Sequence, residues 1–199
     1  CYEPWRMHRD TYIKEHIKAH GIDVHTCNGS LLWEPWNVKK ADGTPYKVFT
    51  PFYHNGCFNA EEPRFPLSKP ENVNYVSDQT QIGIDALDLL PKTPWYEQLE
   101  PHWEIGEVGA HKRFETFIDE GLFSYKDGRN LPAKPYVSRL SPYLHFGEIS
   151  PNKLWHAVRS IGDDKHIEHF CSELGWREFS YSQLYHNPEL PSKNMQSKF

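Results

Sequence analysis

Prolines are concentrated between residues 60 and 105, and they limit what this part of the 199-residue chain can form. The stretch contains Pro63, Pro66, Pro70, Pro91, Pro94 and Pro101. Each proline lacks a backbone donor and fixes its own φ, so helices and central strands are disfavoured where prolines recur this often. The pattern predicts an irregular connector over 61–105, which separates residues 1–60 from 106–199.

The first sixty residues are typical of the end of an α/β unit. We expect a helix over 6–20, ended by Gly21, and then a short strand over 22–26, where apolar and polar residues alternate. Apolar positions expected to form part of a buried stripe on the helix are Met7, Ile13 and Ile17. A helix, a glycine turn and a strand form the second half of a βαβ crossover, so we expect partner strands upstream and a chain that is a fragment.

After residue 106 the apolar spacing becomes helical. The period, together with Gly and Pro at the boundaries, predicts helices over 107–120, 151–160 and 165–185. Candidate core residues of the first two are Val108, Phe114, Phe117, Ile118, Leu122, Leu154, Trp155 and Val158. The third should bury Ile167, Phe170, Cys171, Leu174, Tyr181 and Tyr185. The second half is therefore expected to be all-α.

Composition excludes several classes of protein. No apolar run approaches the roughly 18 residues of a membrane-spanning helix, so we expect no membrane partner and a cytoplasmic location. The four cysteines are widely spaced, which argues against a disulfide framework or a structural zinc site. His166 and His169 are expected on a solvated helix face, so no metal site is assigned. The net charge is −5, but residues 125–199 are mildly basic, which permits contact with phosphates.

The third helix carries polar residues at the spacing of one helix face. Glu173, Trp176, Arg177 and Ser180 follow one another at i, i+3, i+4 and i+7 and could line a polar cavity. Alternatively, Glu173 and Arg177 form an ordinary surface ion pair. Glu178 turns towards the core face and would need a hydrogen-bond partner if it is buried.

A second polar group, at 138–142, reads SRLSP and precedes a predicted helix. Hydroxyls and free backbone N–H groups at a helix start suit a phosphate, and Arg139 would add charge; the alternative is an ordinary helix cap. The sequence has no P-loop, no GxGxxG motif and no nucleophile–base pair of recognisable spacing, so nothing in it indicates hydrolase chemistry.

Four stretches, in this order, resemble the DNA photolyase/cryptochrome family. They are YEPWRMHRD at 2–10, YKVFTPF at 46–52, YKDGRNLPAKPYVSRLSPYLHFGEISP at 125–151 and ELGWREFSYSQLY at 173–185. The resemblance implies a mixed, mainly helical fold. Residues 1–60 would form the C-terminal part of a Rossmann-like α/β antenna domain, 61–105 an interdomain linker, and 106–199 the N-terminal part of an all-α FAD-binding domain.

The resemblance also implies a cofactor and its site. Residues implied to bind FAD are Tyr125, Val137, Ser138, Arg139, Leu140, Ser141, Phe170, Glu173, Arg177 and Ser180. Glu173 and Trp176 are implied to be catalytic, the first by hydrogen bonding to a flipped-out pyrimidine dimer and the second by stacking on it. Together with Arg129 they would contact DNA. Val137 replaces a threonine that is common in the family, and Phe170 a residue that is often tryptophan.

The implied activity is the light-driven repair of cyclobutane pyrimidine dimers in DNA by electron transfer from reduced FAD, the reaction of a deoxyribodipyrimidine photo-lyase. LHFGEIS at 144–150 is similar to bacterial-type photolyases for these dimers, whereas six-four photolyases and animal cryptochromes usually read LKFGCLS there. A blue-light photoreceptor cryptochrome that binds FAD without repair is the alternative. A third possibility is that this stretch alone is inactive and binds nothing.

The resemblance leaves the antenna chromophore unassigned between a folate and a deazaflavin type. Trp5 and Arg6 stand where folate-type members carry an Asn-Glu pair, so a folate contact of that form is not expected. The expected partner is damaged DNA, and the expected state is a monomer.

Overall fold

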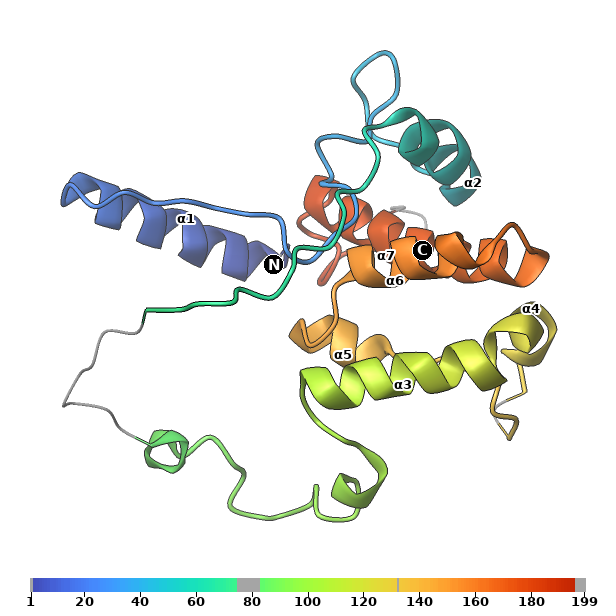
Figure 1. The fold of residues 1–199 in the computed structure, drawn as a ribbon. Coiled ribbons are helices and arrows are strands. Elements are labelled where there is room, and N and C mark those ends of the chain that lie inside the picture. The colour runs from blue at the N-terminus through green and yellow to red at the C-terminus, as the bar shows by residue number, and fades with distance from the viewer. Residues whose placement is uncertain (1, 75–82, 132, 196–199) are drawn as a thin grey trace.

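The computed structural model describes residues 2–74, 83–131 and 133–195, and its regular structure within these ranges is helical, without strands. The longer helices are α1 (Pro4–Ala19), α3 (Glu107–Glu120), α6 (Pro151–Ile161) and α7 (Lys165–His186) (Figure 1). The shorter helices are α2 (Phe49–Pro51), α4 (Tyr125–Gly128) and α5 (Ser141–Phe146). A π-helical turn covers Phe52–Gly56, and 3-10 turns cover Cys57–Asn59, Ile84–Leu87, Glu100–His102 and Leu122–Ser124.

The helices predicted for the second half are confirmed. The expected 107–120 is α3, 151–160 is α6 with one further residue, and 165–185 is α7 with one further residue. Side chains cap two of these helices at the N-terminus, since Ser150 accepts a hydrogen bond from the Lys153 N–H and Asp164 accepts one from the His166 N–H. Local signals therefore locate these helix starts.

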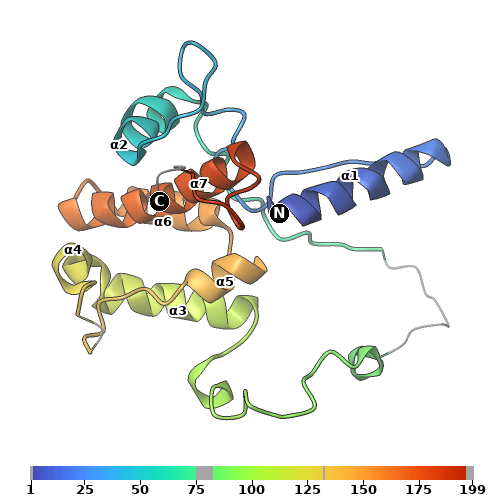
Figure 2. The same cartoon turned by 180° about the vertical axis from the view of Figure 1, so that it is seen from behind.

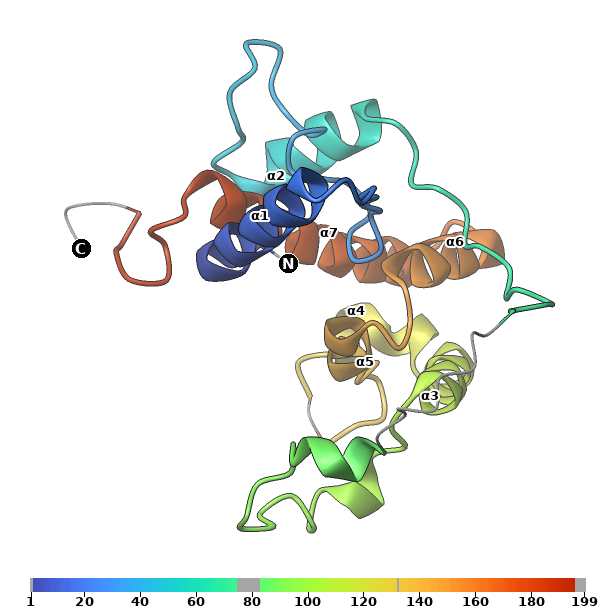
Figure 3. The same cartoon turned by 90° about the vertical axis from the view of Figure 1, so that its left-hand side faces the viewer.

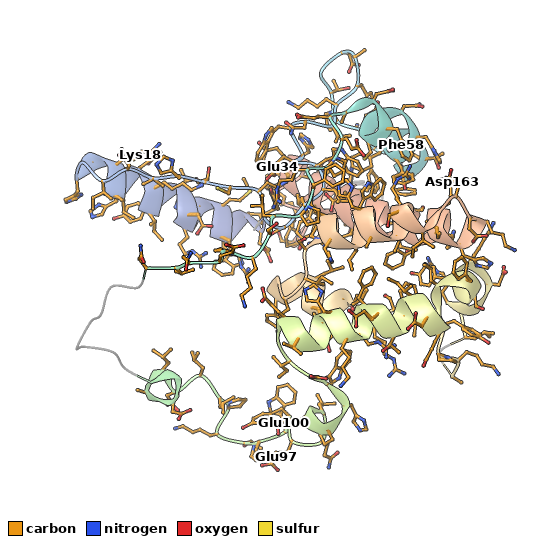
Figure 4. All side chains as sticks on the ribbon, in the orientation of Figure 1. Lys18, Glu34, Phe58, Glu97, Glu100 and Asp163 are labelled. Carbon is orange, nitrogen blue, oxygen red and sulfur yellow. The ribbon has the colours of Figure 1, made fainter. Side chains whose placement is uncertain are left out.

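The first sixty residues differ from the prediction. The helix is present as α1, but the strand over 22–26 is wrong, and Ile22 is 58% exposed. A strand needs a neighbouring strand to bond its backbone groups, and the described ranges provide none. The expected buried stripe of Met7, Ile13 and Ile17 is also wrong, because α1 buries no residue and stands out to one side of the body (Figures 1 and 2). Lys18 lies near its outer end (Figure 4).

Helix α7 is the central element of the core. It contacts α4, α6, the 3-10 turn before α4 and the π-helical turn that follows α2. Figure 3 shows α2 on one side of α7, and α3 and α4 on the other. Its buried side chains include Ile167, Phe170, Cys171 and Leu174, as predicted. Residues from 32 to 57 join the same core, among them Leu32, Trp33, Val38, Phe52, Tyr53 and Cys57.

Four predictions of burial or exposure need correction. Val108 is 75% exposed because it lies in the first turn of α3 on the outward side. Tyr181 and Tyr185 are half-buried rather than buried. His166 is not on a solvated face: it is buried, and its Nδ1 lies 3.1 Å from the Lys126 backbone N–H, which donates to it. The histidine thus ties α7 to α4.

The proline-dense stretch holds little regular structure where it is described, at 61–74 and 83–105. Two 3-10 turns interrupt it, and Glu97 and Glu100 lie on an outlying part of it (Figure 4). Among all described residues, no helix combines the length and apolar character that crossing a membrane requires.

Candidate functional site

A polar cluster joins α4 to α7. Arg129, directly after α4, forms an ion pair with Glu173 of α7, and both side chains are partly exposed. The Arg129 guanidinium also lies over the Tyr125 ring, 5.8 Å from its centroid, and its Nη1 is 3.3 Å from Nε2 of His169. His169 Nε2 is in turn 3.9 Å from Glu173 Oε1. The cluster therefore combines a guanidinium, a carboxylate, an imidazole and a phenol.

An aromatic layer supports this cluster from the core side. Tyr125 and Phe170 meet edge to face with centroids 5.4 Å apart, and Phe117 of α3 contacts both rings at 5.5 and 5.0 Å. All three rings are buried. Two of these contacts are edge to face and the Phe117–Phe170 contact is tilted by 41°, and such packing fixes the orientation of the rings below the polar groups.

The electrostatics of the cluster follow from burial and from the ion pair. Burial raises the pKa of Tyr125, and the nearby Glu173 raises it further. The hydrogen bond to Glu173 raises the pKa of Arg129. Burial and the Arg129 charge lower the pKa of His169 below its ordinary value of 6.5.

Trp176 lies one turn beyond Glu173 on α7 and is 44% exposed. Its indole stacks face to face on Phe49 of α2, with centroids 3.7 Å apart and planes 11° from parallel. Ser180, one turn further on, donates its hydroxyl hydrogen to the Trp176 carbonyl at 2.9 Å. An exposed indole is thus held against a second ring on the protein's surface.

Arg177 and Glu178 turn away from these residues. Arg177 donates from Nη1 to Glu178 Oε1 at 3.0 Å, and its guanidinium lies 5.0 Å over the Tyr181 ring. Glu178 is 2% exposed, and its Oε2 accepts the backbone N–H groups of Leu32 and Trp33 at 2.9 and 3.1 Å. Burial raises the Glu178 pKa to about 7. The predicted need of a buried Glu178 for partners is confirmed.

The segment 137–141 is anchored to α3. Arg113 donates from Nε to the Ser138 carbonyl at 3.0 Å and from Nη2 to the Val137 carbonyl at 3.3 Å. Leu140 is buried, and Arg139 takes a left-handed backbone conformation with φ of 54°, which is uncommon for a residue other than glycine. No described residue makes a hydrogen bond or an ion pair with the side chains of Ser138, Arg139 or Ser141.

The structure thus sorts the residues that the sequence singled out. Tyr125, Arg129, Phe170 and Glu173 come together, whereas Trp176 packs separately on Phe49 and Arg177 pairs with Glu178. Two residues that contact these side chains were not predicted as site residues: His169, which was expected on a solvated helix face, and Phe49. His169 could have been found, because it lies four residues before Glu173 on the same helix face. Phe49 is distant in sequence, and no local pattern links it to Trp176.

Comparison with known proteins finds relatives of this chain in one family. The DNA photolyase family model matches residues 1–71. A deoxyribodipyrimidine photo-lyase of Agrobacterium fabrum is 36% identical over 203 residues, which cover 100% of this chain and 42% of that protein. Cryptochrome-1 of Arabidopsis thaliana is 28% identical over 94% of this chain and 29% of its own length.

A solved structure gives the same result in three dimensions. The crystal structure of a bacterial class III photolyase from Agrobacterium tumefaciens matches with a TM-score of 0.83 and 35% identity, over 100% of this chain and 42% of that one. This chain therefore spans less than half the length of these relatives. The ordered motifs and the matches over the whole chain show that it belongs to the DNA photolyase family.

Proposed function

We propose that this chain forms part of a deoxyribodipyrimidine photo-lyase, which repairs cyclobutane pyrimidine dimers in DNA by light-driven electron transfer from reduced FAD. The observation that carries the proposal is that two groups stand one turn apart on α7: the Glu173 carboxylate, held by Arg129, and the exposed indole of Trp176. A hydrogen-bonding group beside a stacking surface suits a pyrimidine dimer that is flipped out of the duplex.

The residues of this chain fit FAD, which carries two phosphates and a ribityl chain. Ser138, Arg139 and Ser141 offer two hydroxyls and a cation that make no hydrogen bond or ion pair with any described residue, and Arg113 holds the backbone carbonyls of residues 137 and 138. When bound, FAD supplies the light absorption and the electron. We assign FAD binding to the ten residues that the resemblance implies. Those at the phosphates and the ribityl chain would be Tyr125, Val137, Ser138, Arg139, Leu140 and Ser141, and those along the flavin cavity would be Phe170, Glu173, Arg177 and Ser180.

The roles of the protein groups follow from their surroundings. Trp176 would stack on one pyrimidine, because Phe49 covers only one face of the indole. Glu173 would hydrogen-bond to the edge of the dimer, and Arg129 both orients the Glu173 carboxylate and offers a cation to the DNA backbone. The buried aromatic layer below excludes water from this side of the cluster.

The division of the chain belongs to the same proposal. Residues 1–60 would end the antenna domain, 61–105 would be the linker, and 106–199 would begin the FAD-binding domain. The antenna chromophore stays open between folate and deazaflavin types. The proposed partner is damaged DNA, bound by a monomer in the cytoplasm.

The test is the binding of dimer-containing DNA by the protein expressed from its complete reading frame, with each variant matched for flavin occupancy. Base–aromatic stacking contributes about 1–3 kcal/mol, so Trp176→Ala should weaken the affinity about 5- to 150-fold. Trp95→Ala is the matched control, because Trp95 is 66% exposed and lies outside the cluster. Equal affinities of the two variants would contradict the assignment of Trp176.

The match to a cryptochrome gives the alternative function, a photoreceptor that binds FAD without repair. Under this alternative the wild-type protein would carry flavin but would bind dimer-containing and undamaged DNA equally. The two functions therefore separate in the same binding experiment.

A further inference from the structure

Segment 49–53 packs on α7 at the position of Trp176, and it does so through two separate contacts. Phe49 stacks on the Trp176 indole with centroids 3.7 Å apart and planes 11° from parallel. One residue earlier on α7, Tyr53 lies against the backbone of Gly175, where a methyl group would stand 2.4 Å from Tyr53 Cδ2. Only glycine allows so close an approach without movement.

The two contacts are coupled by the rings themselves. Phe49 and Tyr53 are stacked within the segment, with centroids 5.5 Å apart and planes 13° from parallel. Phe179 of α7 contacts the edges of both Phe49 and Trp176, at 6.0 and 5.9 Å. Tyr53 is buried, whereas Phe49 is half-buried and Trp176 is 44% exposed. The stack therefore rises from the core to the surface and ends in the indole.

The geometry points to Phe49 as a positioning residue that holds the Trp176 indole in the orientation in which it receives a pyrimidine dimer. The close contact between Tyr53 and Gly175 sets the distance of segment 49–53 from α7, and thereby the position of the Phe49 ring against the indole. This inference rests on the proposed function. An exposed tryptophan on a helix samples several rotamers, and ordering it on binding would cost affinity. Because Phe49 stacks on one face of the indole, it fixes the Trp176 rotamer before DNA binds, and the other face of the indole stays free for the dimer.

The stack can be tested without DNA. In protein from the complete reading frame, labelled with 5-fluorotryptophan, the ¹⁹F resonance of Trp176 is identified by its loss in Trp176→Phe. Phe49→Leu keeps an apolar side chain but removes the ring current, so it should move this resonance. Phe49→Tyr should leave it in place. Phe58→Leu is the matched control, because Phe58 lies five residues beyond this segment (Figure 4), where its ring packs on Tyr53 and His54 at 5.0 and 6.1 Å. An unmoved resonance in Phe49→Leu would overturn the inference.

The role in binding is tested by a double-mutant cycle with flavin-loaded protein. Aromatic pairs of this kind predict a loss of about 2- to 12-fold in affinity for dimer-containing DNA in Phe49→Leu, rescued in Phe49→Tyr, with unchanged affinity for undamaged DNA. In the Trp176→Ala background, Phe49→Leu should cause no further loss. An equal loss in both backgrounds would show that Phe49 acts through folding rather than through Trp176.

The outcomes separate the two proposals. If the wild type prefers dimer-containing DNA but Phe49→Leu binds it equally well, the positioning role is wrong and the proposed function stands. If the wild type shows no preference, the proposed function is wrong and the positioning role falls with it.

Discussion

Glu178 is expected to be the most costly side chain of α7 to remove. It is 2% exposed, and its two oxygens satisfy the backbone N–H groups of Leu32 and Trp33 and the guanidinium of Arg177. Leu32 and Trp33 are themselves buried, so water cannot replace the lost acceptor. Each buried donor left unsatisfied costs about 1–3 kcal/mol, which predicts a loss of about 2–6 kcal/mol in the free energy of unfolding for Glu178→Ala.

The assay is urea unfolding at pH 6, followed by circular dichroism on the protein from its complete reading frame. Glu178→Gln is the matched control, since its amide oxygen still accepts a backbone hydrogen bond, and it should lose about 1–2 kcal/mol. A Glu178→Ala midpoint within error of the wild type would refute the argument that this carboxyl joins residues 32–33 to α7.

The same group predicts a pH dependence. Burial raises the Glu178 pKa from 4.5 to about 7, so between these values the folded state holds a proton that the unfolded state has lost. The contribution of Glu178 to stability is therefore greatest below pH 4.5 and falls as the pH rises through 7, by roughly 3 kcal/mol in all. His169, whose pKa is lowered, acts in the opposite direction, so the quantity to follow is the wild type minus Glu178→Gln. A difference that stays constant from pH 5 to 8 would contradict the assignment.

Three further outcomes are expected. Replacing Ser138 and Ser141 together by Ala should lower the flavin content of purified protein, measured by absorption, whereas retention at wild-type affinity would remove them from the phosphate site. Gly175→Ala should destabilise by about 1–3 kcal/mol in urea unfolding, although alanine favours helices, because its methyl group would stand 2.4 Å from Tyr53; a more stable variant would show that Tyr53 moves freely. Glu173→Ala should reduce repair per absorbed photon more than it reduces affinity for dimer-containing DNA, and a loss in affinity alone would assign Glu173 to binding only.

The helices of the second half could be predicted from the sequence because their signals are local. The period of apolar residues and the caps at Ser150 and Asp164 lie within a few residues of the structure they specify. The strand over 22–26 could not be judged in this way, because a strand depends on neighbours that local alternation does not reveal. The exposed Val108 shows the same limit, because the helical period predicts which residues share a helix face but not whether another element covers that face.

The candidate site was predicted only where its residues share a motif. Glu173 and Trp176 lie on one helix, and their spacing indicated a common face. Phe49 is more than a hundred residues away, and only the packing of α2 on α7 brings its ring to the indole. The burial of Glu178 likewise required hydrogen-bond donors, but the sequence could not identify them. They are backbone N–H groups of Leu32 and Trp33, which lie far from Glu178 in the sequence.

The most direct test of the proposed function is light-driven repair by the wild-type protein. Flavin-loaded, fully reduced protein from the complete reading frame is mixed with an oligonucleotide that carries one cyclobutane pyrimidine dimer, and intact pyrimidines are counted after blue light and after darkness. The proposal predicts restored pyrimidines in the illuminated sample alone, together with tighter binding of the dimer than of undamaged DNA. No repair under light, with equal binding of the two DNAs, would contradict it and favour the photoreceptor.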